Sequence, residues 1–235
     1  MNDEAEIPGW WIGFWDYLDD AERQALLDLG RKRTFAADTT LLHEEEPSNH
    51  VLIVMSGWVK VTCQDSEGRE VVLALRGPGD IIGEMEVMLE DSGRSASVRS
   101  LLNNSVDALV LPPSRFISFL GHYPNAWLAL YKVLAYRLRQ SNRNAREFGR
   151  IGVRQALARL LLELAVRHGT KNADGSVTVQ VLSQEEIAAF IWSSRDAVAR
   201  ELVQFRERGL LSTGRRSYTI NDMGSLRKIA KSGGY

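Results

Sequence analysis

Cysteine is nearly absent from this chain of 235 residues, in which Cys63 is the single example. One thiol excludes an intrachain disulfide framework, and also an iron–sulfur cluster or cysteine-rich zinc site supplied by this chain alone. It fits a reducing cytoplasm. No apolar run approaches the roughly 20 residues of a membrane span, and the N-terminus does not have the pattern of a signal peptide. The sequence therefore predicts a cytoplasmic protein with no membrane partner.

Motifs of metal binding and catalysis are also missing. The four histidines show no metal-ligand spacing, although a haem-binding histidine stays open. There is no HExxH motif, no P-loop and no Ser/His/Asp or Cys/His arrangement in recognisable context. Glu84 beside Arg94 has groups suited to acid–base work, but no nucleophile accompanies them. We therefore expect no enzyme, no catalytic or metal-ligating residue and no prosthetic group.

The net charge of −1 hides an unequal distribution of charge. Residues 1–135 hold 11 Lys and Arg against 21 Asp and Glu, and residues 136–235 hold 18 against 9. The first part is thus −10 and the second +9. Such asymmetry indicates a C-terminal part that binds nucleic acid. The alternative is a basic, solvated helical surface.

Residues 183–211 have the pattern of a helix-turn-helix. Ser183 and Glu186 form an S-x-x-E capping box, which begins a first helix. Ser193 or Ser194 then supplies a second start signal. A buried stripe at helical spacing follows: Val198, Leu202 and Phe205. The sequence predicts two short helices with a tight turn between them.

Three charged residues lie off this stripe, near the start of the second helix: Arg195, Asp196 and Arg200. In helix-turn-helix proteins this position faces base edges in the major groove. Arginine matches the O6 and N7 acceptors of guanine, and a carboxylate accepts from cytosine N4. The alternative interpretation is a pair of amphipathic helices with solvated charges.

The N-terminal part begins with a tryptophan-rich segment, IPGWWIGFWDYL, and a predicted helix over residues 14–33. Asp19 and Glu22 mark the helix start, and leucines supply its apolar face. Tryptophan favours a membrane interface, but the segment has no basic face and contains Asp16. We expect it to cap its own domain or contact a partner.

Residues 34–111 contain five short runs rich in β-branched residues, separated by turn signals such as Gly77-Pro78-Gly79-Asp80. Regularly spaced short strands predict a barrel or a sandwich. Residues 113–148 then turn helical, and a long apolar stripe of this kind indicates a dimer interface or packing against the barrel.

Gly149-Arg150-Ile151-Gly152 interrupts the helical pattern and predicts a hinge. A third helix follows and ends at Gly169. Residues 212–220 predict two short strands, the wing of a winged helix. Arg215 and Arg216 at its tip are expected to contact phosphates, or else to lie in an exposed turn.

The order of β-barrel, long helix, hinge and winged helix-turn-helix resembles the cyclic AMP receptor protein family, the Crp–Fnr regulators, over nearly the whole chain. The most specific match outside the DNA-binding part is Gly83-Glu84-Met85 followed by Arg94-Ser95-Ala96. The resemblance implies an α+β fold with a β-roll or jelly-roll cyclic-nucleotide-binding domain, a dimerisation helix and a winged helix-turn-helix. The corresponding boundaries are residues 1–122, 123–148, a hinge at 149–152, and 153–235.

The two matching pieces are similar to the family's phosphate-binding cassette. Gly83 lets backbone approach a ligand closely, and Glu84 can accept a hydrogen bond from a ribose 2′-hydroxyl. Arg94 can hold a cyclic phosphodiester with a charge-assisted fork. Ser95 adds a hydroxyl and a backbone donor. A surface arginine among strands is the alternative.

The purine end of the implied site falls on the long helix. Aligning Arg137-Leu138 with the family's arginine–leucine pair places Ser141 and Asn142 at the purine-contacting positions. The family's cyclic AMP receptors commonly have hydroxyl residues there, so Asn142 puts the choice among adenine, guanine and a dinucleotide in doubt. Both residues are otherwise solvated helix positions.

The stretch SRDAVAR is similar to the family's S-R-E-T-V-x-R recognition sequence. Asp196 replaces the usual glutamate and is one methylene shorter, so the DNA half-site can differ from the family's TGTGA type. Trp192 stands where the turn usually has glycine, which leaves the form of the turn open.

The resemblance implies a homodimeric transcription factor controlled by a cyclic nucleotide such as cyclic AMP. Its other implied partners are a pseudo-palindromic site on double-stranded DNA and RNA polymerase. Three alternatives remain: another nucleotide or no ligand within the same family, a nucleotide-binding module acting on a protein partner, and an enzyme.

Overall fold

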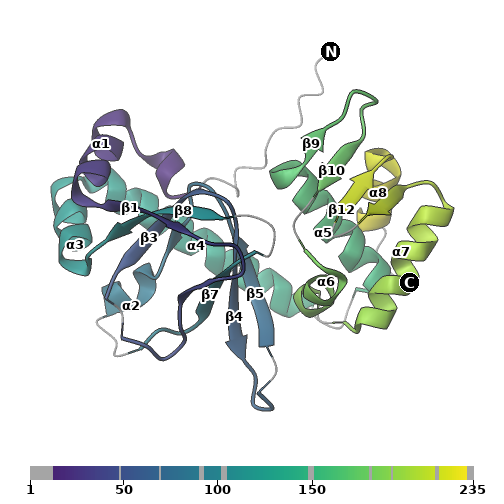
Figure 1. The fold of residues 1–235 in the computed structure, drawn as a ribbon, viewed down its shortest axis with the longest axis horizontal. Coiled ribbons are helices and arrows are strands. Elements are labelled where there is room, and N and C mark those ends of the chain that lie inside the picture. The colour runs from purple at the N-terminus through teal and green to yellow at the C-terminus, as the bar shows by residue number, and fades with distance from the viewer. Residues whose placement is uncertain are drawn as a thin grey trace. The chain divides into compact units, whose positions relative to one another are not determined.

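The computed structural model describes most of the chain, namely residues 13–47, 49–68, 70–89, 93–101, 105–147, 151–179, 182–191, 193–214 and 217–231. The chain divides into two compact units, residues 1–141 and 142–235 (Figure 1). Residues 1–12 of the tryptophan-rich segment and residues 149–150 of the predicted hinge lie outside the described residues.

The first unit is built on two four-stranded antiparallel sheets. One sheet has the order β1 (Arg31–Phe35), β8 (Val106–Leu111), β3 (Val51–Ser56) and β6 (Ile81–Ile82). The other has the order β2 (Thr40–Leu42), β7 (Ser97–Ser100), β4 (Val59–Gln64) and β5 (Glu70–Arg76). The β-rich fold predicted for this region is confirmed.

Strand β3 contributes side chains to two separate hydrophobic cores, one on each of its faces. Successive side chains of a strand point to opposite faces. Leu52 and Val54 enter a core shared with residues of the second sheet. Val51 and Ile53 enter a separate core shared with the helices. All four side chains are fully buried, so β3 is apolar without alternation, as a strand covered on both faces should be.

The helices of this unit are η1 (Trp15–Tyr17), α1 (Asp20–Leu29), α2 (Glu84–Leu89), α3 (Pro113–His122) and α4 (Pro124–Glu147). The capping box predicted at Asp19 and Glu22 forms, with bonds of 2.9 and 2.8 Å. The helix predicted for residues 14–33 is too long at both ends, since α1 begins at Asp20 and stops at Leu29, and Arg31 begins β1. The helix predicted for residues 113–148 is interrupted at Tyr123, ahead of Pro124.

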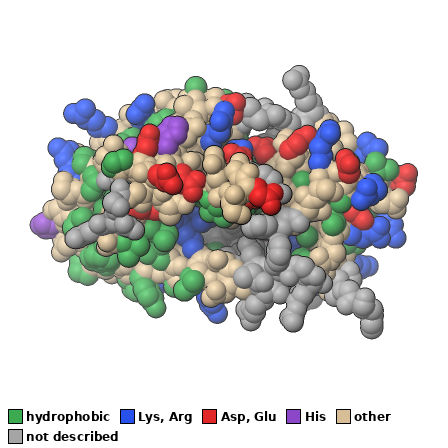
Figure 2. All heavy atoms as spheres, turned by 90° about the horizontal axis from the view of Figure 1, so that it is seen from below, with side chains coloured by type: hydrophobic (Ala, Val, Ile, Leu, Met, Phe, Trp, Pro, Cys, Tyr) green, Lys and Arg blue, Asp and Glu red, His purple; other side chains and the backbone are tan. Residues whose placement is uncertain are grey.

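Several large apolar side chains of α4 are exposed in this single chain: Trp127, Leu128, Tyr131 and Leu138. The opposite side of the same helix contributes Ala126, Ala129, Leu130 and Val133 to the core of the first unit. Figure 2 shows hydrophobic side chains gathered toward one end of the view, on the first unit. The long apolar stripe therefore serves the unit's own core on one side and remains uncovered on the other.

The described part of the second unit consists of four helices and a small antiparallel sheet. Its elements are α5 (Val153–His168), β9 (Thr170–Lys171), β10 (Val177–Val179), α6 (Gln184–Phe190), α7 (Arg195–Glu207), β11 (Leu211–Gly214), β12 (Ser217–Ile220) and α8 (Met223–Lys231). The sheet order is β11-β12-β10-β9. The two strands after α7 are those predicted for the wing. Gly169 caps α5 with φ of −72°, so the cap is not left-handed.

No described helix of either unit has the length and apolar character needed to cross a membrane.

Candidate functional site

Gly83 and Glu84 connect β6 to α2 at one edge of the first unit. Gly83 has a φ of +76°, a backbone conformation that favours glycine. A side chain at this position would also collide with the guanidinium of Arg94. Glu84 begins α2 and is only 2% exposed. The local sequence thus places a glycine where an arginine must approach the backbone, and a carboxylate directly after it.

The backbone around Arg94 is fixed by two hydrogen bonds to the loop after β2. The amide of Glu45 donates to the Arg94 carbonyl at 2.9 Å, and the Arg94 amide donates to the Glu46 carbonyl at 3.1 Å. Glu45 itself has a φ of +66°, which is uncommon for a residue other than glycine. Such strain tends to occur at functional sites, where the surrounding structure holds it in place.

The Arg94 guanidinium is buried but incompletely paired. The side chain is 4% exposed, and its Nη2 donates to the His50 carbonyl at 2.9 Å. Among the described residues, its Nη1 is a buried nitrogen with no acceptor. Burial lowers the pKa of Arg94, against the opposing charges of Glu86 and Glu46. Burying an unpaired charged donor costs free energy, and a negatively charged acceptor would remove that cost.

Ser95 is held by a neighbouring carboxylate. Its backbone amide and hydroxyl both donate to Glu86 Oε1, at 3.0 and 2.6 Å. Burial raises the pKa of Glu86, but these bonds, together with a backbone hydrogen bond and the positive charge of Arg94, lower it more, so the pKa lies below its usual value. The two donors that the sequence assigned to a ligand are therefore engaged within the protein. Glu86 was not predicted as a site residue. Of the adjoining cassette residues, Met85 is exposed and Ala96 is half-buried.

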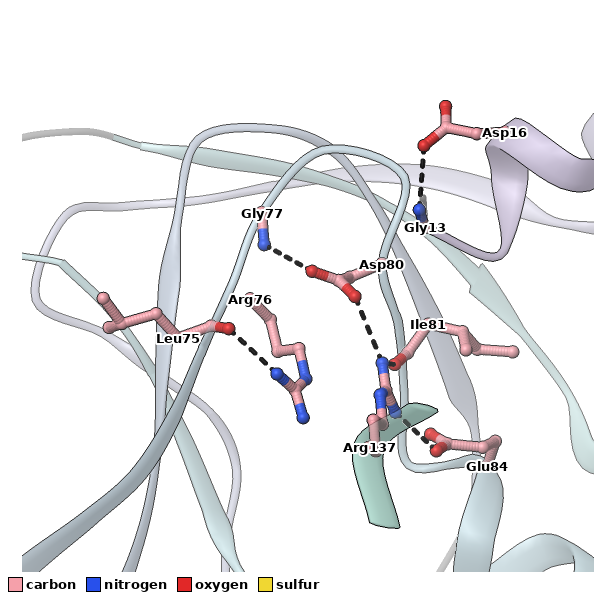
Figure 3. Close-up of polar contacts among 9 residues, drawn as sticks. All are labelled: Gly13, Asp16, Leu75, Arg76, Gly77, Asp80, Ile81, Glu84 and Arg137. Carbon is pink, nitrogen blue, oxygen red and sulfur yellow. Dashed lines mark hydrogen bonds and ion pairs between the residues drawn. The ribbon is translucent and has the colours of Figure 1, made fainter. Parts of the chain in front are cut away.

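Arg137 of α4 connects the cassette to the long helix (Figure 3). Its Nη1 donates to Glu84 Oε1 at 2.7 Å. Its Nη2 donates to Asp80 Oδ1 at 3.2 Å and to the Ile81 carbonyl at 2.7 Å. Asp80 is a functional neighbour that the sequence analysis treated only as part of a turn. The Asp80 carboxylate also accepts from the Gly77 amide at 2.9 Å, which shapes that turn.

Arg76, the last residue of β5, lies beside this group. Its Nη1 donates to the Leu75 carbonyl at 3.1 Å. Burial and the positive charge of Arg137 lower the pKa of Arg76 to about 10, against the opposing effect of Asp80 and Glu84. Arg76 was not predicted as a site residue, because an arginine at the end of a strand is ordinarily a surface residue.

Ser141 and Asn142, the predicted purine contacts, are exposed positions on α4. No hydrogen bond between described residues joins either of them to the cassette. Their proposed role remains a prediction.

In the second unit, the predicted start signals form as side-chain caps. Ser183 and Glu186 make the capping box of α6, with bonds of 2.8 and 3.2 Å. The hydroxyl of Ser194 accepts from the Ala197 amide at 3.2 Å and begins α7. The stripe of Val198, Leu202 and Phe205 is fully or nearly fully buried, as predicted.

Burial of that stripe turns the charged residues of α7 outward. Arg195, Asp196 and Arg200 are all exposed. Arg195 Nε pairs with Glu185 Oε1 of α6 at 2.8 Å, and both side chains are 63% exposed. The sequence analysis did not consider Glu185. Arg215 and Arg216 of the wing, and Trp192 of the turn, lie outside the described residues.

Comparison with known proteins accounts for both units. Residues 32–123 match the family described as the cyclic nucleotide-binding domain. Residues 155–229 match the Crp-like helix-turn-helix domain. The two matches cover the β-rich first unit and the helix-turn-helix of the second.

Individual relatives match over most of their length. The CRP-like cAMP-activated global transcriptional regulator of Mycobacterium tuberculosis is 31% identical over 84% of this chain and 87% of its own. The cAMP-activated global transcriptional regulator CRP of Salmonella typhimurium is 25% identical over 76% of this chain and 83% of its own. The structure of FixK2 from Bradyrhizobium japonicum, at 20% identity, shares the fold with a TM-score of 0.75 and covers 87% of this chain and 99% of its own.

Proposed function

Because the chain belongs to the Crp–Fnr family of transcriptional regulators, we propose that it works as a homodimer whose affinity for DNA is set by cyclic AMP or a related cyclic nucleotide. Its two domains are those of a cyclic nucleotide-binding regulator with a helix-turn-helix. The family consists of regulators and not of enzymes. The relatives named above include proteins described as cAMP-activated, which supports cyclic AMP as the first effector to test.

The observation that carries this proposal is the buried Nη1 of Arg94, which has no acceptor in the part of the chain that the structure describes. A cyclic phosphodiester brings a negatively charged oxygen, and arginine binds such oxygens with short, charge-assisted hydrogen bonds. Gly83 leaves room for the guanidinium beside the backbone, and the bonds at Glu45 and Glu46 fix its position.

The link from ligand to DNA would begin at Glu84. Glu84 Oε1 accepts from Arg137, and a carboxylate has two acceptor oxygens, so a ribose hydroxyl bound to Glu84 would share this carboxylate with Arg137. Arg137 lies on α4, and a change in its pairing is a change in what holds this helix to the first unit. A ligand shifts a two-state equilibrium only through its different affinity for the two states. The Glu84–Arg137 pair is the contact through which that difference would arise.

The DNA contacts would come from α7. Arg195, Asp196 and Arg200 are exposed near its N-terminal end, the part of a recognition helix that meets base edges. In a homodimer formed through the exposed apolar side of α4, two recognition helices would lie about 34 Å apart on a pseudo-palindromic site. Such a regulator acts in the cytoplasm, and RNA polymerase is its natural protein partner.

The test combines calorimetry with DNA binding. The purified protein is titrated with cyclic AMP and with cyclic GMP, and its affinity for DNA is measured with and without each nucleotide. Arg94→Ala should lower nucleotide affinity by about 100-fold or more, since it removes a buried charge-assisted contact. Arg99→Ala is the matched control, because Arg99 lies five residues further along the chain in β7 and pairs with Asp38 at the surface.

Wild-type binding near one nucleotide per subunit, lost in Arg94→Ala and kept in Arg99→Ala, would support the proposal. Absence of heat with both nucleotides across several temperatures, or equal affinity in the wild type and Arg94→Ala, would overturn the cyclic nucleotide as effector. DNA binding would then stand as a separate result.

A further inference from the structure

Arg76 has more donors than its protein surroundings use. The side chain is half-buried at the end of β5. A guanidinium carries five N–H donors. Within the part of the chain that the structure describes, the acceptor that it contacts is the carbonyl of the preceding residue, Leu75. In Figure 3 the Leu75 carbonyl lies on one side of the Arg76 guanidinium and the Arg137 side chain on the other.

The carboxylates nearest to Arg76 are bonded to other groups. Asp80 accepts from Gly77 and Arg137, and Glu84 accepts from Arg137. Neither carboxylate forms an ion pair with Arg76. Arg76 is close enough to Arg137 for the two positive charges to interact, and among the described residues Arg137 is the one of the two that pairs with carboxylates. A half-buried cation beside another cation is unfavourable unless some acceptor reaches it.

Arg76 and Arg94 are connected through the contacts of the residues between them. Arg94 Nη1 faces Gly83, and the next residue, Glu84, is bonded to Arg137. Arg76 in turn lies beside Arg137 and Asp80. A cyclic nucleotide with its phosphate on Arg94 and its ribose at Glu84 would extend its base along these residues. The group that meets Arg76 would then be an edge of the base.

We propose that Arg76 determines base specificity and that the site prefers a guanine-bearing cyclic nucleotide to cyclic AMP. This inference rests on the proposed function, since it assumes a nucleotide bound by its phosphate at Arg94. Guanine presents two adjacent acceptors, O6 and N7, which match the two parallel donors of a guanidinium. Adenine presents N7 beside the N6 amino group, which is itself a donor. Facing Arg76, adenine would set donor against donor.

A second phosphate is the other acceptor with the right charge, as in a cyclic dinucleotide. Guanine is favoured because the charges of this group already balance, with Arg76 and Arg137 beside the two carboxylates of Asp80 and Glu84. A second phosphate would add an uncompensated negative charge, whereas guanine's acceptors are neutral. The two sources differ in one testable way: cyclic di-AMP has two phosphates and no guanine, and cyclic GMP has guanine and one phosphate.

The experiment measures dissociation constants of cyclic GMP, cyclic AMP and cyclic di-AMP for the wild type, Arg76→Leu and Arg76→Lys. The expected wild-type preference for cyclic GMP over cyclic AMP is about tenfold or more, the range of one bidentate base contact. Arg76→Leu, which keeps an apolar stem, should bring the ratio of the two constants close to one. Arg76→Lys, which keeps the charge and loses the fork, should give an intermediate ratio. Thermal unfolding of each variant establishes that the ratio is measured on folded protein.

Three results would overturn the inference while leaving the proposed function intact. These are a wild-type preference for cyclic AMP, a ratio unchanged by Arg76→Leu, and tight binding of cyclic di-AMP without binding of cyclic GMP. If none of the three nucleotides binds the wild type, the proposed function itself fails and the inference fails with it.

Discussion

The cassette of the first unit and the recognition helix of the second use the same residue types in opposite environments. Around Arg94 and Glu84 the charged groups are 4% and 2% exposed. Glu84 pairs with Arg137 at 2.7 Å. Arg195 of α7 and Glu185 of α6 pair at 2.8 Å, but both side chains are 63% exposed. The contribution of an ion pair to stability depends on its burial as much as on the identity of its two residues.

This difference separates two ways of holding a negatively charged ligand. A buried donor must have a definite partner, so the cassette suits one small ligand of defined shape. Exposed charges remain hydrated and are screened by salt, so α7 suits a long polyanion that it meets from solution. The predictions below test this contrast.

The largest effect is expected from breaking the buried pair at Glu84. Arg137→Met should destabilise the first unit by about 3 kcal/mol, because it leaves Glu84 buried without its cationic partner. Urea unfolding at pH 7 measures the change. Arg139→Met is the matched control, since Arg139 is exposed on the same helix, and it should change stability by less than about 0.5 kcal/mol. Equal effects of the two variants would refute a structural role for the Glu84–Arg137 pair.

The next largest effect is expected on the discrimination of DNA bases by α7. Arg195→Ala should weaken discrimination at one base pair of the operator by about 1–3 kcal/mol. Affinities for a set of DNA sites that differ at single positions measure it. Arg206→Ala, at the other end of α7, serves as control. A uniform loss on all sequences would instead identify Arg195 as a phosphate contact.

A smaller effect should follow from releasing Arg195 from its surface partner. Glu185→Gln removes a carboxylate that repels DNA phosphates and competes for Arg195. DNA affinity is expected to rise by a few-fold at low salt and to return to the wild-type value at high salt. A salt titration of binding for both proteins checks this. An increase that persists unchanged at high salt would contradict a screened surface interaction.

The smallest effect is a pH dependence of nucleotide binding through His50. Burial and the positive charges of Arg94 and Arg33 hold the pKa of His50 below 6.5. A phosphate on Arg94 would offset that positive charge, so the pKa of His50 should be higher in the complex and binding should take up protons. Affinity is therefore expected to increase as the pH falls from about 7 toward 5, and to be flat above. Calorimetry in two buffers of different ionisation enthalpy measures the proton uptake, and His50→Gln should abolish it.

Local signals in the sequence were sufficient for the helix starts. The capping boxes at Asp19 and Ser183 depend on residues three positions apart, and both form as predicted. The buried stripe of α7 likewise follows from helical spacing alone. The β-branched runs predicted the strands for a similar reason, because strand residues that meet an apolar layer must themselves be apolar.

The sequence-based predictions are wrong where contacts between residues far apart in the chain determine the local structure. Residues 31–33 were predicted to continue a helix, but they form β1 and pair as an antiparallel strand with Val110 to Ala108 of β8. The short helix α2 lay inside a region predicted as strands, and Pro124 divides the long helix, since proline cannot donate the backbone bond that would continue it. The pairing of Arg137 with Asp80 and Glu84 joins residues 57 and 53 positions apart. No spacing rule along the chain could have predicted it.

The attachment of η1 has a practical consequence for spectroscopy. The Trp15 amide donates to the Gly79 carbonyl at 3.0 Å, one residue before the Asp80 that Arg137 holds. The backbone of a tryptophan is therefore attached to the loop that carries Asp80 of the charged cluster. With the other five tryptophans replaced by phenylalanine, the emission of Trp15 would report rearrangements at Asp80 without any attached dye.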